Sequence, residues 1–325
     1  MGIKRRISKA RERSVTIEDA WTEFIEEKKA LNKSAKTIIS FEGSFKRWYD
    51  YIEASGYGLE VKDVDATYIY SFTNHFLNEE MKPTTLNHYL REIRAFLYWC
   101  MEEGRDYVAP FKIKLVTEQE VIKETYTDDE LDKLLARPKR NATYVEWRTW
   151  AIVNWIIATG NRAATVVNVR LGDVNYNKRE INITKTKSNK AMIIPLSPAL
   201  ATVLKEFVSR WRYDAADDDF LFANIGGEQM TVDSLKHALR KYNDAREVDK
   251  TSIHALRHTF AKNWIRTTGD VFRLQKLLGH STLEMTRKYV NMFNEDLKEN
   301  FEVFNPLDNF KKGASRTQKV GKSRE

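Results

Sequence analysis

The sequence predicts a mainly α-helical protein with a small β-hairpin or sheet, an α+β chain of two domains. Its 325 residues suit two domains, and 42% hydrophobic residues suffice for buried cores, which excludes a wholly disordered chain. Apolar residues recur at helical spacing along most of the chain, and a strand-like pattern is confined to a short region near the middle. We therefore expect a helical first domain and a mixed, mostly helical second domain.

The first domain is expected over residues 15–104 as four helices. Ser34 is a plausible N-cap for the second helix, and a short third helix follows near residues 66–76. The fourth begins near Pro83 and ends at Gly104. The inward-facing residues expected from the spacing are Ile17, Ala20, Trp21, Phe24, Ile25, Ile38, Phe41, Phe45, Trp48, Tyr49, Ile52, Leu86, Leu90, Ile93, Phe96 and Leu97.

Residues 105–124 are predicted to be an extended linker, because they contain Pro110 and lack helical periodicity. The net charge of +8 lies in the two ends of the chain. Residues 1–14 and residues 311–325 each carry +5, and the body between them carries −2. The basic pI therefore indicates solubilising tails as readily as nucleic-acid binding.

The second domain is expected over residues 125–295, followed by a C-terminal tail over 296–325. Thr127 and Glu130 form a capping-box pattern, and the same pattern at Ser281 and Glu284 precedes a helix that carries Tyr289. The other expected helices are 127–135, 147–159 (ending at Gly160), 198–211, 232–242, 254–266 and 271–278, and the expected strands are 174–176, 180–184 and 192–196.

The sequence gives no sign of membrane insertion or secretion. The longest apolar stretch, residues 147–158, is short and contains Arg148 and Asn154, which favours a core helix. No apolar segment follows the charged N-terminus, so we do not expect a secretory signal. The single cysteine, Cys100, cannot form an internal disulfide, and we expect a reducing, cytoplasmic setting.

Several polar residues of the second domain stand where a functional side chain could be held. Arg162 follows a glycine turn, Lys187 lies at a hairpin tip, and His280 follows Gly279 before a predicted helix start. His254 and Arg257 are three residues apart and share a helix face, and Tyr289 lies on the last predicted helix. Taken singly, each also suits an ordinary surface or packing residue. His254 and His258 could form a metal pair, but no acid or cysteine has matching spacing.

Taken in order, these residues resemble the tyrosine recombinase (phage integrase) family. The matching stretches are Thr159-Gly-Asn-Arg162, His254-Ala-Leu-Arg257-His258-Thr-Phe260, Leu277-Leu-Gly-His280-Ser281 and Thr286-Arg-Lys-Tyr289. Pro195, eight residues after Lys187, fits the register of the family's hairpin lysine. The resemblance implies a helical core-binding domain over 15–104 and a catalytic domain over 125–295.

The resemblance implies strand transfer through a 3′-phosphotyrosyl intermediate, with Tyr289 as the nucleophile. Arg162 and Arg257 would bind the non-bridging phosphate oxygens, and His254 would assist loss of the phenol proton. Lys187 would protonate the leaving 5′ oxygen, although Lys185 is an alternative. His280 would hold a non-bridging oxygen. One ester replaces another, so no ATP, metal ion or other cofactor is implied.

The same resemblance implies double-stranded DNA with a specific recombination site as the substrate, a homotetramer on DNA, and DNA-bending accessory proteins as further partners. The candidate DNA contacts in the first domain are Lys82, Thr84, Thr85, Arg91 and Arg94. Apolar residues near the C-terminus, Phe301, Val303 and Phe304, would dock on a neighbouring protomer or on their own domain. Thr165 stands where the family often has an acid, so we expect Asp173 to support Arg162.

Three other functions compete with this interpretation. A type IB topoisomerase would use a similar site without partner exchange. A non-catalytic DNA-binding regulator would have no reason to keep all six candidate catalytic residues. A zinc hydrolase would depend on His254 and His258.

Overall fold

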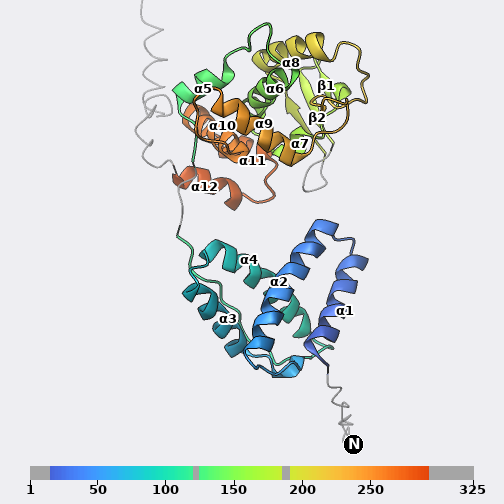
Figure 1. Ribbon diagram of the computed structural model, residues 1–325, viewed down its shortest axis with the longest axis vertical. Coiled ribbons are helices and arrows are strands. Elements are labelled where there is room, and N and C mark those ends of the chain that lie inside the picture. The colour runs from blue at the N-terminus through green and yellow to red at the C-terminus, as the bar shows by residue number, and fades with distance from the viewer. Residues whose placement is uncertain (1–14, 120–123, 185–190, 293–325) are drawn as a thin grey trace, which may run out of the picture. The chain divides into compact units, whose positions relative to one another are not determined.

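The computed structural model describes residues 15–119, 124–184 and 191–292. The chain divides into two compact units, residues 1–120 and 121–325, and each has its own hydrophobic core (Figure 1). The helical content and the small antiparallel sheet confirm the predicted fold class. The predicted tails, Phe301, Val303 and Phe304, and both hairpin lysines, Lys185 and Lys187, lie outside the described residues. Within the described part, no helix is long and apolar enough to cross a membrane.

The first unit is a helical bundle, and its second helix begins at the predicted N-cap, Ser34. The Thr16 and Ser34 hydroxyls accept backbone N–H groups at the starts of the first two helices. Helix α4 ends at Cys100, four residues before the predicted end, because Met101 caps it and the chain then turns to Gly104. Its helices are α1 (Ile17–Ala30), α2 (Ala35–Ala54), α3 (Ala66–Asn78) and α4 (Pro83–Cys100), with a 3₁₀ turn, η1, at Val61–Asp63.

The segment predicted as a linker is extended, but most of it packs on the first unit. Val108 and Ile113 are buried in that unit's core. The Asn87 side chain donates to the Val116 carbonyl at 2.7 Å and accepts the Val116 N–H at 2.8 Å. The first unit therefore reaches residue 120 rather than residue 104. The sequence did not show this because the partners lie about 30 residues away along the chain.

The second unit is built around α6 (Tyr144–Thr159), which is buried on nearly every side. It begins three residues before the predicted start because the Thr143 hydroxyl accepts the Glu146 N–H. Its main packing partners are α8 (Pro198–Trp211), α9 (Val232–Asp244) and α10 (Ile253–Thr268). The remaining helices are α5 (Asp128–Leu135), α7 (Ala163–Val166), η2 (Leu171–Asp173), α11 (Val271–Leu278) and α12 (Glu284–Met292).

The sheet is antiparallel, with strands in the order β1 (Val174–Asn175), β2 (Glu180–Ile183) and β3 (Met192–Pro195). Ile183 pairs with Met192, so the hairpin beyond these residues carries the two lysines. The capping box predicted at Ser281 and Glu284 is wrong. Helix α12 begins at Glu284, and the Ser281 hydroxyl instead approaches the Met285 sulfur at 3.7 Å.

Candidate active site

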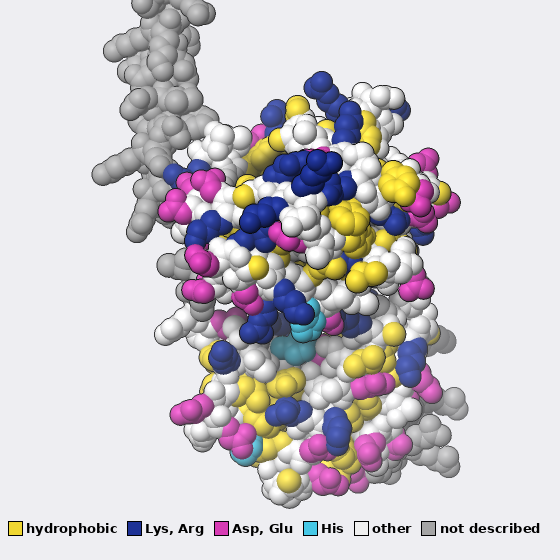
Figure 2. Space-filling view, turned by 45° about the horizontal axis from the view of Figure 1, so that its top comes forward, with side chains coloured by type: hydrophobic (Ala, Val, Ile, Leu, Met, Phe, Trp, Pro, Cys, Tyr) yellow, Lys and Arg dark blue, Asp and Glu magenta, His cyan; other side chains and the backbone are white. Residues whose placement is uncertain are grey.

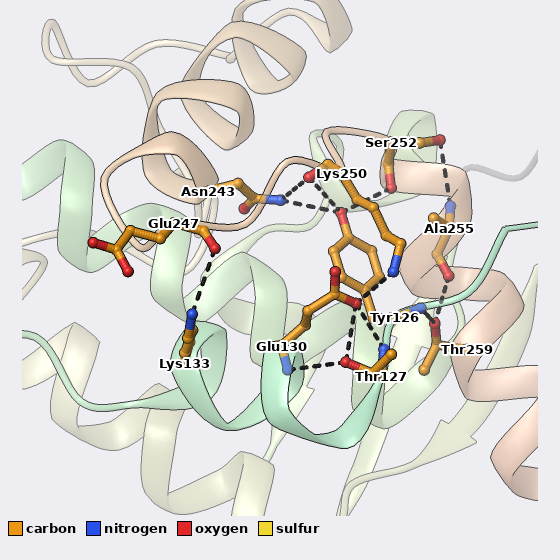
Figure 3. Close-up of polar contacts among 10 residues, drawn as sticks. All are labelled: Tyr126, Thr127, Glu130, Lys133, Asn243, Glu247, Lys250, Ser252, Ala255 and Thr259. Atoms are coloured by element: carbon orange, nitrogen blue, oxygen red, sulfur yellow. Dashed lines mark hydrogen bonds and ion pairs between the residues drawn. The ribbon is translucent and has the colours of Figure 1, made fainter.

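A polar network fixes the start of α10, the helix that carries His254, Arg257 and His258 (Figure 3). The Tyr126 N–H donates to the Thr259 hydroxyl at 2.8 Å, and the Tyr126 hydroxyl donates to the Lys250 carbonyl at 3.2 Å. Burial raises the pKa of Tyr126 to about 12, so this hydroxyl remains a donor. Asn243 donates to the Tyr126 oxygen, and Glu130 forms an ion pair with Lys250 at 2.6 Å. These bonds hold α10 against α5 and α9.

The Arg257 guanidinium is buried at the ends of two helices. Its Nη1 donates to the Gly160 carbonyl at 2.6 Å, and its Nη2 donates to the Leu278 carbonyl at 2.9 Å. Gly160 caps α6 and Leu278 is the last residue of α11, so both carbonyls lie at the negative ends of helix dipoles. Among the described residues Arg257 forms no ion pair with an acid, so these carbonyls stabilise the cation and leave its charge available to an anion.

Gly160 is required at its position for two reasons. Its φ is +64°, in the left-handed region, and an added Cβ would lie 2.4 Å from Phe260 Cδ1 and 2.7 Å from Leu278 Cδ2. Its carbonyl is also the acceptor for Arg257. The glycine in the matched Thr-Gly-Asn-Arg stretch therefore sets the position of a guanidinium nearly 100 residues later.

Arg162 lies beside Arg257 and is half-buried. Its Nη1 donates to the Leu278 carbonyl at 3.2 Å, so the two arginines share one acceptor. Burial and the charge of Arg162 lower the pKa of Arg257 to about 10. The prediction that Asp173 supports Arg162 is wrong, because the Asp173 carboxylate caps the Arg170 N–H at 2.8 Å and the Leu278 carbonyl takes the supporting role.

A cavity of about 540 Å³ opens beside the arginines. Its polar wall includes Arg162, Arg257 and His280, and its apolar wall includes Ile183 and Met192 of the sheet. The hairpin that carries Lys187 and Lys185 leaves the sheet at those two strand residues. The strand ends that flank the predicted lysine hairpin, Ile183 and Met192, therefore line the cavity. The lysines themselves lie outside the described residues.

Tyr289 on α12 is buried next to Arg257 and Arg162. Its hydroxyl lies 2.9 Å from Nδ1 of His258, and its ring stacks on that of His280 with an interplanar angle of 3°. Burial raises the pKa of the phenol, while a hydrogen bond and positive charge from Arg257 and the charge of Arg162 oppose that rise. The net result is a raised pKa, so the phenol keeps its proton in the resting site, and the two arginines offset part of the cost of forming its anion.

The contact of His258 with the phenol is not predicted by the sequence. From the sequence His258 is only a possible metal ligand with His254, because a histidine next to Arg257 on a helix indicates no partner by itself. Among the described residues, no group of three or more histidine, cysteine, aspartate or glutamate side chains could hold a metal ion. The contact of His258 with Tyr289 joins residues of two helices that are 31 positions apart in the sequence, and no local pattern indicates such a contact.

His254 is exposed and lies in a different cavity, of about 310 Å³, beside Lys236, His237 and Arg240. Figure 2 shows histidine side chains exposed among lysine and arginine side chains on the face in view. Although part of the residue is exposed, partial desolvation of its ring and then the charges of Arg257, Arg162 and Lys236 lower the pKa of His254, which favours its neutral form. The structure thus brings His254 near the arginines, but it is His258 that contacts the phenol.

The DNA contacts predicted in the first unit lie on or next to α4. Lys82, Thr84 and Thr85 are exposed at its N-terminal end. Arg91 is exposed and forms an ion pair with Glu118 at 3.0 Å, and Arg94 is partly buried. Three of the five side chains are thus exposed at one helix end, while Arg91 has an internal partner.

Comparison with known proteins agrees with this geometry. The model of the phage integrase family matches residues 124–296. Tyrosine recombinase XerD of Listeria innocua is 25% identical over 279 residues, covering 84% of this chain and 93% of the relative. Tyrosine recombinase XerC of Staphylococcus aureus is 23% identical, covering 82% and 90%.

Two solved structures share the fold. The XerH recombinase bound to palindromic difH, a post-cleavage complex, has a TM-score of 0.67 and 19% identity, covering 90% of each chain. The Tn1549 transposon integrase in complex with circular intermediate DNA has a TM-score of 0.65 and 19% identity, covering 85% of this chain and 95% of that chain. Because the family model spans more than half of the sequence, the chain belongs to the phage integrase family.

Proposed function

We propose that this protein is a site-specific DNA recombinase, an enzyme that cuts and rejoins duplex DNA through a 3′-phosphotyrosyl intermediate. It would serve the integration or excision of a mobile element, or the resolution of DNA. The observation that carries the proposal is the buried Tyr289 hydroxyl beside Arg257 and 2.9 Å from His258. A phenol held among cations in a dry site is suited to attack a phosphodiester, whose charge grows in the transition state.

The two arginines would bind the non-bridging oxygens of the phosphate. Arg257 is held by the Gly160 and Leu278 carbonyls, and such a fixed guanidinium needs little reorganisation when charge develops. His280 would also bind a non-bridging oxygen of the phosphate. Lys187, or Lys185, would protonate the leaving 5′ oxygen. The position of the flanking strand ends, Ile183 and Met192, at the cavity supports this role.

The contact of His258 with the phenol favours this residue over His254 as the proton acceptor. In the cleavage step the Tyr289 oxygen forms a bond to phosphorus and the phenol proton moves to Nδ1 of His258. The bond between phosphorus and the 5′ oxygen breaks at the same time. Attack by a new 5′ hydroxyl reverses these changes and returns the proton. His254, near both arginines, would then assist in binding the phosphate.

The proposed partners are double-stranded DNA with a specific site and three further copies of the chain on that DNA, with DNA-bending accessory proteins. Lys82, Thr84, Thr85, Arg91 and Arg94 are the proposed contacts in the first unit. A DNA substrate makes the cytoplasm the expected place of action. Sedimentation with a DNA site would report the assembly, and a monomer at all DNA ratios would contradict the tetramer.

The proposal can be tested with nicked suicide substrates that trap the covalent intermediate. We expect the wild-type protein to form a denaturant-resistant adduct and Tyr289→Phe to form none while still binding DNA. Tyr213→Phe is the matched control, because it removes the hydroxyl of a tyrosine that is 79% exposed. Relaxation of supercoiled plasmid without any site dependence would instead favour the topoisomerase alternative.

A further inference from the structure

We propose that Thr286 is a positioning residue that fixes the orientation of the His280 ring and joins the helix of the nucleophile to the phosphate-binding arginines. The catalytic role of Thr286 rests on the proposed function. Its hydrogen bond to His280 is a feature of the second unit that does not depend on that function.

The hydrogen bonds around His280 permit only one neutral tautomer. Nε2 of His280 lies 2.9 Å from Nη2 of Arg257, and Nδ1 lies 2.8 Å from the Thr286 hydroxyl oxygen. A guanidinium has donors and no acceptor, so Nε2 must accept. A neutral imidazole carries a single proton, which is therefore on Nδ1 and is donated to Thr286.

The second partner of that imidazole belongs to the nucleophile's own helix. Thr286 is fully buried and lies three residues before Tyr289 on α12, so the two side chains are about one turn apart. The His280 ring is parallel to the Tyr289 ring, with centroids 6.3 Å apart. Any shift of α12 therefore alters the orientation of the imidazole that faces Arg257.

The arrangement has a consequence for the chemistry. In this structure Nε2 of His280 accepts a hydrogen bond and has none to donate to a phosphate. When a phosphate oxygen takes the Arg257 donor, Nε2 loses its partner and becomes free to take up a proton from the solvent. The bond from Nδ1 to Thr286 is unaffected by this exchange, so it keeps the ring aimed at the phosphate while its role changes from acceptor to donor.

The variants Thr286→Val and Thr286→Ser separate the effect of the hydroxyl group from the effect of the side-chain volume. Valine keeps the branched shape and removes the acceptor, whereas serine keeps the acceptor. We expect Thr286→Val to lower the rate constant of adduct formation about tenfold or more, the effect of losing one buried hydrogen bond, with DNA affinity little changed. We expect Thr286→Ser to retain most of the rate. Thr202→Val is the control for a helical Thr→Val change, since this exposed hydroxyl donates to the Pro198 carbonyl far from the site.

The tautomer is measured directly by ¹⁵N NMR of histidine-labelled protein without DNA, with the His280 signal assigned by its loss in His280→Gln. The wild-type spectrum should show a proton on Nδ1. Thr286→Val should keep that tautomer, which the Arg257 donor dictates, but should shift the Nδ1 signal because its hydrogen-bond acceptor is gone. A wild-type ring protonated on Nε2 would overturn the proposal, as would a Thr286→Ser variant as slow as Thr286→Val. If the wild-type protein forms no adduct, the proposed function fails, while the NMR result still decides the tautomer.

Discussion

Replacement of Gly160 by alanine should damage both stability and the site. A residue other than glycine in the left-handed conformation costs about 1–2 kcal/mol. The new methyl group would also lie 2.4 Å from Phe260 Cδ1, and such overpacking costs about 1–3 kcal/mol more. Because the Gly160 carbonyl accepts from Arg257, the movement that relieves the clash also displaces the guanidinium.

Gly269 provides the matched control. It caps α10 as Gly160 caps α6, with a φ of +63°, but nothing lies within 4 Å of an added Cβ. Gly269→Ala should therefore lose only about 1–2 kcal/mol. We expect urea denaturation to show Gly160→Ala less stable than Gly269→Ala by about 1–3 kcal/mol, and suicide substrates to show slower adduct formation for Gly160→Ala alone. Equal losses of stability with equal, wild-type cleavage would refute the reasoning.

Three other predictions concern charge and proton transfer. His258→Asn should slow adduct formation about 10²-fold or more and make it depend more steeply on pH, with a smaller effect for His254→Asn; the opposite order would return the proton-acceptor role to His254. Burial and then the charges of Arg257 and Arg162 lower the pKa of His280 to about 4, so below pH 6.5 the unfolded state binds a proton that the folded state does not. The free energy of unfolding should then fall as the pH drops from about 6.5 to about 4, with a smaller fall in His280→Gln measured by urea denaturation, and identical pH slopes would contradict this. DNA binding should weaken steeply with salt, and Lys82→Ala should lower the slope of log K against log salt by about one, whereas an unchanged slope would remove Lys82 from the DNA contacts.

Local features of the fold followed well from the sequence. The N-caps predicted at Ser34 and Thr127 each accept the expected backbone N–H, because a cap depends on residues three positions apart. The strands also agree with their pattern within one or two residues. The capping box at Ser281 failed because the same residue types also suit a turn that precedes the helix.

Contacts across long stretches of chain could not be predicted in this way. The order of arginine, histidine and tyrosine residues indicated the family, but not that His258 would contact Tyr289 or that Thr286 would bind His280. The packing of residues 107–118 on the first unit was missed for the same reason. Each of these contacts depends on how helices are placed, and their residue types are common in ordinary helices.

The central claim is that the Tyr289 oxygen becomes esterified to a DNA 3′ phosphate. Protease digestion of the trapped adduct, followed by mass spectrometry, locates the residue joined to DNA and the strand end it holds. We expect a single linkage, from Tyr289 to a 3′ phosphate, with a free 5′ hydroxyl on the released strand. A linkage to any other residue, or to a 5′ phosphate, would contradict it.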